Sequence, residues 1–169
     1  MKFIITNRSF KTEGRKYRLI RDEHEDGFFR IQALIDFVTK AGVVLAGETG
    51  GLVSGEHNLS QEGSCWIHKN AVVLDDASIQ VDAQVFDFAS VCNNAMVLER
   101  ACVYGHSIAF EDAIVFGSAR VCEGASIFGR SWICGNAMIC GTAHVTGLSH
   151  VHGNVTIGQN KIIIDEVIP

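Results

Sequence analysis

A pattern of six residues repeats sixteen times between Cys65 and Ile157 without a single insertion. In each repeat a small residue stands two positions before a branched aliphatic residue. A period of six fits neither an isolated helix nor a half-buried strand, because those repeat at about 3.6 and 2 residues. The pattern instead predicts a coil of short strands joined by tight corners, with the aliphatic side chains pointing inward.

The two slots of this pattern are filled consistently, and only Ala109 departs from the aliphatic rule. The small slot holds Cys65, Ala71, Ala77, Ala83, Ala89, Ala95, Ala101, Ser107, Ala113, Ala119, Ala125, Ser131, Ala137, Ala143, Ser149 and Val155. The aliphatic slot holds Ile67, Val73, Ile79, Val85, Val91, Val97, Val103, Ala109, Val115, Val121, Ile127, Ile133, Ile139, Val145, Val151 and Ile157.

The second and third positions after each aliphatic residue carry residues that are typical of turns. Glycine recurs in the first position, at residues 105, 117, 129, 135, 141, 147 and 153. Asparagine or aspartate recurs in the second, at residues 70, 76, 82, 94, 112, 136 and 154. All three residue types tolerate a left-handed backbone, so such corners are predicted at both positions. Three hexads would close one triangular coil, giving about five coils stacked at roughly 4.8 Å.

These hexads resemble those of the hexapeptide-repeat proteins, whose fold is a left-handed parallel β-helix. The resemblance alone implies the hand, since parallel crossovers are right-handed in nearly all other folds. The expected fold class is therefore all-β, a left-handed parallel β-helix with a small N-terminal β cap.

The segments that lead into the repeat carry a narrower resemblance. Residues 30–37 (RIQALIDF), 40–42, 47–53 and 58–67 (NLSQEGSCWI) resemble a branch of the family from enteric bacteria that is labelled acetyltransferase. This resemblance implies an acyltransferase that uses acetyl-CoA or another acyl-CoA. The label rests on fold analogy, however, and the hexads lack the long loop that commonly interrupts the coil in family enzymes. The alternatives are a non-catalytic trimer that binds a small anionic ligand such as a nucleotide between subunits, and a purely structural module.

The repeat divides the chain into three parts. Residues 1–40 are expected to form a β-meander cap, with strands at 3–6, 17–21 and 28–37 separated by glycine-containing turns. Residues 41–158 are expected to form the β-helix, and residues 159–169 a C-terminal capping strand. Caps are needed because the open end of a β-helix presents unpaired strand edges.

Charge and cysteine content restrict the class of partner. The net charge is −5, with nine Lys or Arg against six Asp or Glu in residues 1–40 and five against thirteen in the remainder. An acidic coil disfavours a nucleic-acid partner, because it repels the phosphate backbone. No apolar run approaches a membrane span, which favours a cytoplasmic protein without a membrane partner. The six cysteines show no CxxC spacing, so reduced thiols are expected; the alternative is a metal or redox pair at Cys122 and Cys140.

Outward side chains eighteen residues apart should stack into three faces, two of which are apolar. A monomer rarely exposes so much contiguous apolar surface. Together with the family resemblance, this surface predicts a homotrimer; alternatively, the N-terminal segment folds over one face. The residues expected at the trimer interface are Met96, Leu98, Ile108, Phe110, Ile114, Phe116, Phe128 and Trp132.

The third face combines aromatic side chains with one cation and is the candidate ligand site. Trp66, Phe86, Tyr104 and Arg120 lie in its outward slots. Aromatic rings beside a guanidinium suit a nucleotide or the nucleotide part of an acyl carrier, so these four residues are predicted to bind a small-molecule ligand.

Four histidines are candidate general bases. Acyl transfer from a thioester needs a group of near-neutral pKa to deprotonate the acceptor, and imidazole supplies it. His144, His150 and His152 crowd the last coil, and His106 stands at an exposed corner. The resemblance implies a catalytic histidine at a subunit interface. The alternatives are a metal on the trimer axis and ordinary surface packing.

Overall fold

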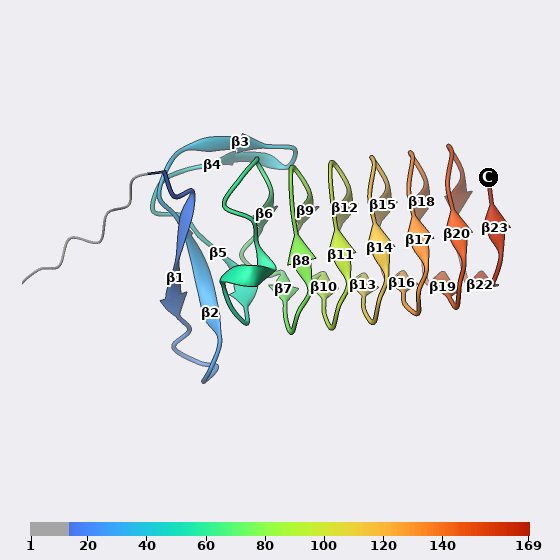
Figure 1. The fold of residues 1–169 in the computed structure, drawn as a ribbon, viewed down its shortest axis with the longest axis horizontal. Coiled ribbons are helices and arrows are strands. Elements are labelled where there is room, and N and C mark those ends of the chain that lie inside the picture. The colour runs from blue at the N-terminus through green and yellow to red at the C-terminus, as the bar shows by residue number, and fades with distance from the viewer. Residues whose placement is uncertain (1–13) are drawn as a thin grey trace, which may run out of the picture.

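The protein, seen in a computed structural model that describes residues 14–169, is a left-handed parallel β-helix of about six turns (Figure 1). This confirms the expected fold class, with about one turn more than expected. The strand predicted at residues 3–6 lies outside the described residues.

Three sheets form the sides of the coil, and strands that neighbour each other in a sheet are three apart in chain order within the repeat. The first sheet contains β1 (Tyr17–Arg21), β2 (Phe29–Ala33), β5 (Thr49–Val53), β7 (Val72–Val73), β10 (Ser90–Val91), β13 (Ile108–Ala109), β16 (Ser126–Ile127), β19 (His144–Thr146) and β22 (Ile162–Ile164). The second contains β8 (Ser78–Ile79), β11 (Met96–Val97), β14 (Ile114–Val115), β17 (Trp132–Ile133), β20 (His150–Val151) and β23 (Val167–Ile168). The third contains β6 (Trp66–Ile67), β9 (Gln84–Val85), β12 (Cys102–Val103), β15 (Arg120–Val121), β18 (Met138–Ile139) and β21 (Thr156–Ile157).

The core is a column of aliphatic side chains in perfect register. Val115 pairs with Val97 on one side and with Ile133 on the other, each eighteen residues away, and all three are fully buried. Every residue of the aliphatic slot is at most 3% exposed. The predicted inward phase of the hexads is therefore confirmed along the whole repeat.

The corners use the left-handed backbone only at their first position. All seven glycines predicted there have positive φ, between 66° and 80°. The second-position Asn and Asp residues do not, so that part of the corner prediction is wrong. Left-handed backbone is instead imposed on non-glycine residues in the first position, including Glu99 and the β-branched Val81, whose φ is 63°. This costs about 1–2 kcal/mol for a residue with a Cβ.

Acidic side chains at the corners recover some of this cost. The Glu111 carboxylate accepts a hydrogen bond from the backbone N–H of Gly129 at 2.7 Å, and the Glu123 carboxylate accepts one from Gly141 at 2.7 Å. In each case donor and acceptor are eighteen residues apart. An ionised acceptor makes a strong hydrogen bond to the stacked corner, so these acids link successive coils.

The N-terminal segment extends the first sheet and also folds back along the third. β1 and β2 pair antiparallel, and β2 pairs antiparallel with β5, which leads into the parallel coil. The strand predicted at 28–37 divides into β2 and β3 (Phe37–Thr39), and β3 pairs with β4 (Gly42–Val44) in a separate hairpin. A short 3₁₀ turn, η1 (Glu56–Asn58), precedes β6. At the other end, β22 and β23 continue the stack in parallel register.

The composition-based expectations concern cysteines and membranes. All six cysteines are unpaired in this structure, and Cys65, Cys102 and Cys122 are buried. Within residues 14–169, no helix has the length and apolar character needed to cross a membrane.

Candidate functional site

The β3–β4 hairpin lies over the third sheet and makes that face unlike the other two (Figure 1). Its strands alternate as a half-buried hairpin should. Phe37 points inward and meets the Trp66 ring edge-on at 5.3 Å, and Val44 is fully buried, whereas Val38 and Val43 point outward. Within residues 14–169, the N-terminal segment therefore covers the mixed third face, and not one of the two apolar faces.

Trp66 is enclosed by this arrangement. Its ring is fully buried between Phe37 and Tyr17, and its indole N–H has no hydrogen-bond partner among the described residues. The expectation that Trp66 faces a ligand cleft is corrected accordingly, because the hairpin, which lies outside the repeat, shields it from solvent. Trp66 instead anchors the hairpin to the coil.

Beyond Trp66 the hairpin tip stands above the sheet and leaves a hollow of about 180 Å³. Its walls combine a stacked aromatic pair with two cations. The rings of Phe86 and Tyr104 are parallel within 10°, with centroids 4.7 Å apart. The lining residues are Lys40, Ala41, Phe86, Cys102, Tyr104 and Arg120. We call this space the cationic hollow.

The electrostatics of the cationic hollow follow from partial burial. Burial raises the pKa of Tyr104 to about 12, with the Cys122 thiol as a second cause, so the phenol is a neutral hydrogen-bonding group at pH 7. Burial also raises the pKa of the Cys102 thiol, against a lowering effect of Lys40. Lys40 and Arg120 are then the charged groups of the lining. Lys40 Nζ is held near the coil by a hydrogen bond to the Arg100 carbonyl at 3.3 Å.

A second hollow of about 340 Å³ adjoins the first and shares Ala41 and Phe86 with it. Its other lining residues are Glu48, His68, Lys69, Asn70 and Asp87. The His68 ring meets Phe86 edge-on at 6.0 Å, in the same outward slot one coil earlier. Burial lowers the pKa of His68. We call this space the histidine hollow.

The four histidines predicted as bases lie elsewhere. His144 is on β19 in the first sheet, whereas His150 and His152 are on or beside β20 in the second, so they do not converge within one chain. The His150 ring stacks on Trp132 at 4.9 Å, and the His106 ring on Phe88 at 5.2 Å. Residues 14–169 contain no group of three or more His, Cys, Asp or Glu side chains placed to hold a metal.

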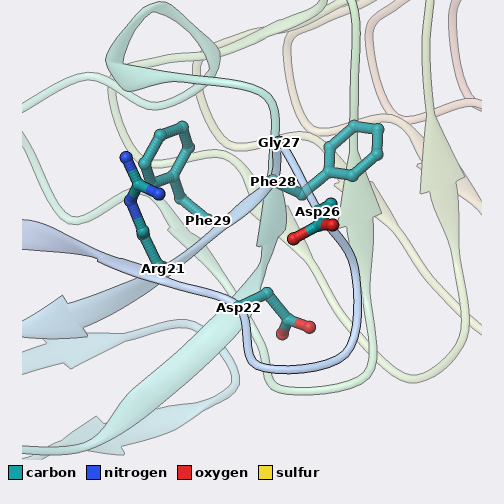
Figure 2. Close-up of a pocket in the computed structure, with 6 residues that line it drawn as sticks. All are labelled: Arg21, Asp22, Asp26, Gly27, Phe28 and Phe29. Atoms are coloured by element: carbon teal, nitrogen blue, oxygen red, sulfur yellow. The ribbon is translucent and has the colours of Figure 1, made fainter.

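Another hollow, of about 120 Å³, lies at the turn that joins β1 to β2 (Figure 2). Arg21, Asp22, Asp26, Gly27, Phe28 and Phe29 line it. Asp22 Oδ1 accepts the backbone N–H groups of His24 and Glu25, and Oδ2 accepts Arg30 Nε at 2.6 Å. These bonds, led by that from His24, lower the pKa of Asp22. The carboxylate is thus engaged in forming the turn, and this hollow is a consequence of the turn geometry.

Three of the four predicted ligand-binding residues, Phe86, Tyr104 and Arg120, line the cationic hollow together. Two further residues of the site, Lys40 and His68, were not predicted from the sequence. Lys40 lies at the turn between β3 and β4, which brings it to the hollow, and the hexad pattern does not predict that position. His68 does carry a signal, because it occupies the same slot as Phe86 and Tyr104 at a spacing of eighteen.

No family model and no curated protein matches this chain. The case for a function therefore rests on the solenoid, which is consistent with a hexapeptide-repeat protein, and on the chemistry of the third face.

Proposed function

We propose that the chain is a hexapeptide-repeat binding protein whose cationic hollow takes a small anionic ligand with a planar ring, of the nucleotide class. The observation that carries this proposal is the pairing of a stacked Phe86–Tyr104 platform with the cations Lys40 and Arg120 around one hollow. Aromatic rings pack against planar ligand rings in edge-to-face or offset-stacked arrangements, and a guanidinium binds phosphate through charge-assisted, often paired, hydrogen bonds. The hollow is smaller than most small-molecule sites, so part of the ligand would lie outside it.

Titration calorimetry tests this proposal with AMP, CoA, adenosine and inorganic phosphate as probes. We expect AMP or CoA to bind more tightly than adenosine or phosphate alone. Changing Arg120 to alanine should weaken binding roughly 10- to 100-fold, because a charge-assisted hydrogen bond contributes about 1.5–3 kcal/mol. Arg130→Ala is the matched control, since Arg130 is 75% exposed at a corner and outside the hollow. Equal affinity of the two variants, or no binding by any probe, contradicts the proposal.

We further propose that the protein is a homotrimer whose protomers meet through the two apolar faces. Trp132 is 43% exposed and Ile108 is 39% exposed in the single chain. The same two apolar faces also contain Ile114, Phe116 and Phe128. Association would remove this surface from water, which is the main favourable term in most assemblies. The family resemblance supports three copies around an axis along the coil.

Changing Phe116 to glutamate is expected to release monomers or produce aggregates, because a carboxylate would be buried in the interface. Thr156→Glu is the control, since Thr156 is exposed on β21 of the third sheet, outside the two apolar faces. Light scattering at micromolar concentration measures the mass of each variant. A monomeric parent, or dissociation by Thr156→Glu alone, contradicts the proposed interface.

Acyl transfer from acetyl-CoA or another acyl-CoA is the second candidate function. It is favoured by the exposure of His106, His150 and His152, which a neighbouring protomer could bring to a bound thioester. His144 is half-buried beside Phe128 and less accessible. Product formation from acetyl-CoA and an amine panel, lost in the His106, His144, His150 and His152 alanine variants, would distinguish this enzyme from a binding protein.

A further inference from the structure

The side chain of Gln84 fixes the protonation pattern of His68. Gln84 is fully buried, and its amide nitrogen donates to the carbonyl oxygens of Ser64 and Asp82 at 2.8 and 3.3 Å. Carbonyl oxygens only accept, so the amide cannot be reversed without placing its own oxygen against two acceptors. Its Oε1 therefore faces His68 Nε2, at 3.1 Å.

His68 must then carry its proton on Nε2. An amide oxygen accepts hydrogen bonds, so Nε2 has to be the donor. In a neutral imidazole the other nitrogen, Nδ1, is left with a free lone pair. Burial is the largest influence on this ring and favours the neutral form, against the effects of the Gln84 bond and of Glu48 and Asp87. At pH 7 His68 is thus a neutral acceptor in a single tautomer.

The two adjoining hollows differ in charge. The cationic hollow has Lys40 and Arg120 in its lining, whereas the histidine hollow has the carboxylates of Glu48 and Asp87 and one cation, Lys69. A ligand that spans both would place its anionic group at Lys40 and Arg120. Its uncharged, donor-bearing end would then lie near His68, where carboxylates repel an anion and the Nδ1 lone pair can accept a hydrogen bond.

We propose that His68 Nδ1 accepts a hydrogen bond from a hydroxyl or amine of the ligand whose anionic group binds at Lys40 and Arg120. This inference rests on the proposed function and specifies its ligand: a monoanion or dianion with a ring in the middle and a hydroxyl or amine at the far end. A nucleoside monophosphate has this order of groups. His68 serves here as a recognition residue, and Gln84 as the residue that positions it.

The first test is the tautomer itself, measured from the imidazole ¹⁵N shifts of the ligand-free protein at pH 7.5. We expect the pattern of a single Nε2–H tautomer for His68, and averaged shifts in Gln84→Met, which removes the acceptor but keeps the side-chain length. An Nδ1–H tautomer or an averaged ring in the parent protein overturns the proposal.

The second test compares AMP with inorganic phosphate. His68→Phe keeps the edge-on ring and removes Nδ1, so it should weaken AMP binding about three- to ten-fold, as for one neutral hydrogen bond, and leave phosphate binding unchanged. In the parent, the His68 Nδ1 resonance should move with AMP and not with phosphate; this readout stands even where the variant does not fold.

The outcomes separate the two claims. If AMP binds and Arg120→Ala weakens it, but neither His68→Phe nor the Nδ1 resonance responds, the role of His68 is overturned and the proposed function stands. If neither AMP nor phosphate binds, the proposed function fails and its extension with it, whatever tautomer His68 shows.

Discussion

Replacing Val115 with aspartate is expected to destabilise the coil by about 4 kcal/mol or more, among the largest effects of any single substitution. Val115 is fully buried between Val97 and Ile133, and these neighbours offer an incoming carboxylate no hydrogen-bond donor. For a chain of this length the melting temperature should fall by roughly 10 °C.

Thr156→Asp is the matched control for this prediction. Thr156 is exposed in an outward slot of β21, next to the inward Ile157. A surface substitution of this kind usually changes stability by less than about 0.5 kcal/mol. Melting curves followed by circular dichroism measure both variants. A Val115→Asp protein that melts with the parent would contradict the inward phase of the hexads.

Replacing Gly63 with alanine is expected to cost about 3 kcal/mol or more, through left-handed backbone strain and a steric clash together. Gly63 has φ of 68°, and a Cβ there would lie 2.0 Å from the Val81 carbonyl oxygen. That oxygen accepts the Cys65 N–H at 3.0 Å, so moving it weakens the start of the first regular coil. The Gly63 carbonyl also accepts from Lys16 Nζ, which ties β1 to the coil.

Gly27→Ala separates the two causes. Gly27 also has a left-handed backbone, with φ of 88°, but a Cβ there would meet no atom within 4 Å. Its substitution should cost only the backbone strain, about 1–2 kcal/mol. Chemical denaturation gives the free energy of unfolding for both variants. Equal losses would show that the close approach of Gly63 to Val81 has no energetic consequence.

The repeat predicted the core because its period reports directly on which side chains stack. Val97, Val115 and Ile133 are one coil apart in sequence and in space, so the spacing alone placed them together. The same reasoning placed Phe86 and Tyr104 in one stack. It failed at the corners, where the stacked backbone imposes a left-handed conformation on Val81 and Glu99 against their own preferences.

The rest of the candidate site could not be predicted, because it depends on a segment outside the repeat. No spacing rule says over which face the β3–β4 hairpin will fold, and that choice buries Trp66 and brings Lys40 toward Arg120. The role of Gln84 could not be predicted from the sequence either, because an outward glutamine in a solenoid is ordinarily solvated. In the folded chain Gln84 is fully buried, so its hydrogen bonds to Ser64, Asp82 and His68 fix the orientation of its amide.

A crystal structure of the protein grown with AMP at millimolar concentration would show directly whether the cationic hollow binds this ligand. We expect density for the phosphate between Lys40 and Arg120, with the ligand extending past Phe86 toward His68. Density on either apolar face or at the β1–β2 turn, with the cationic hollow holding only solvent, would contradict it.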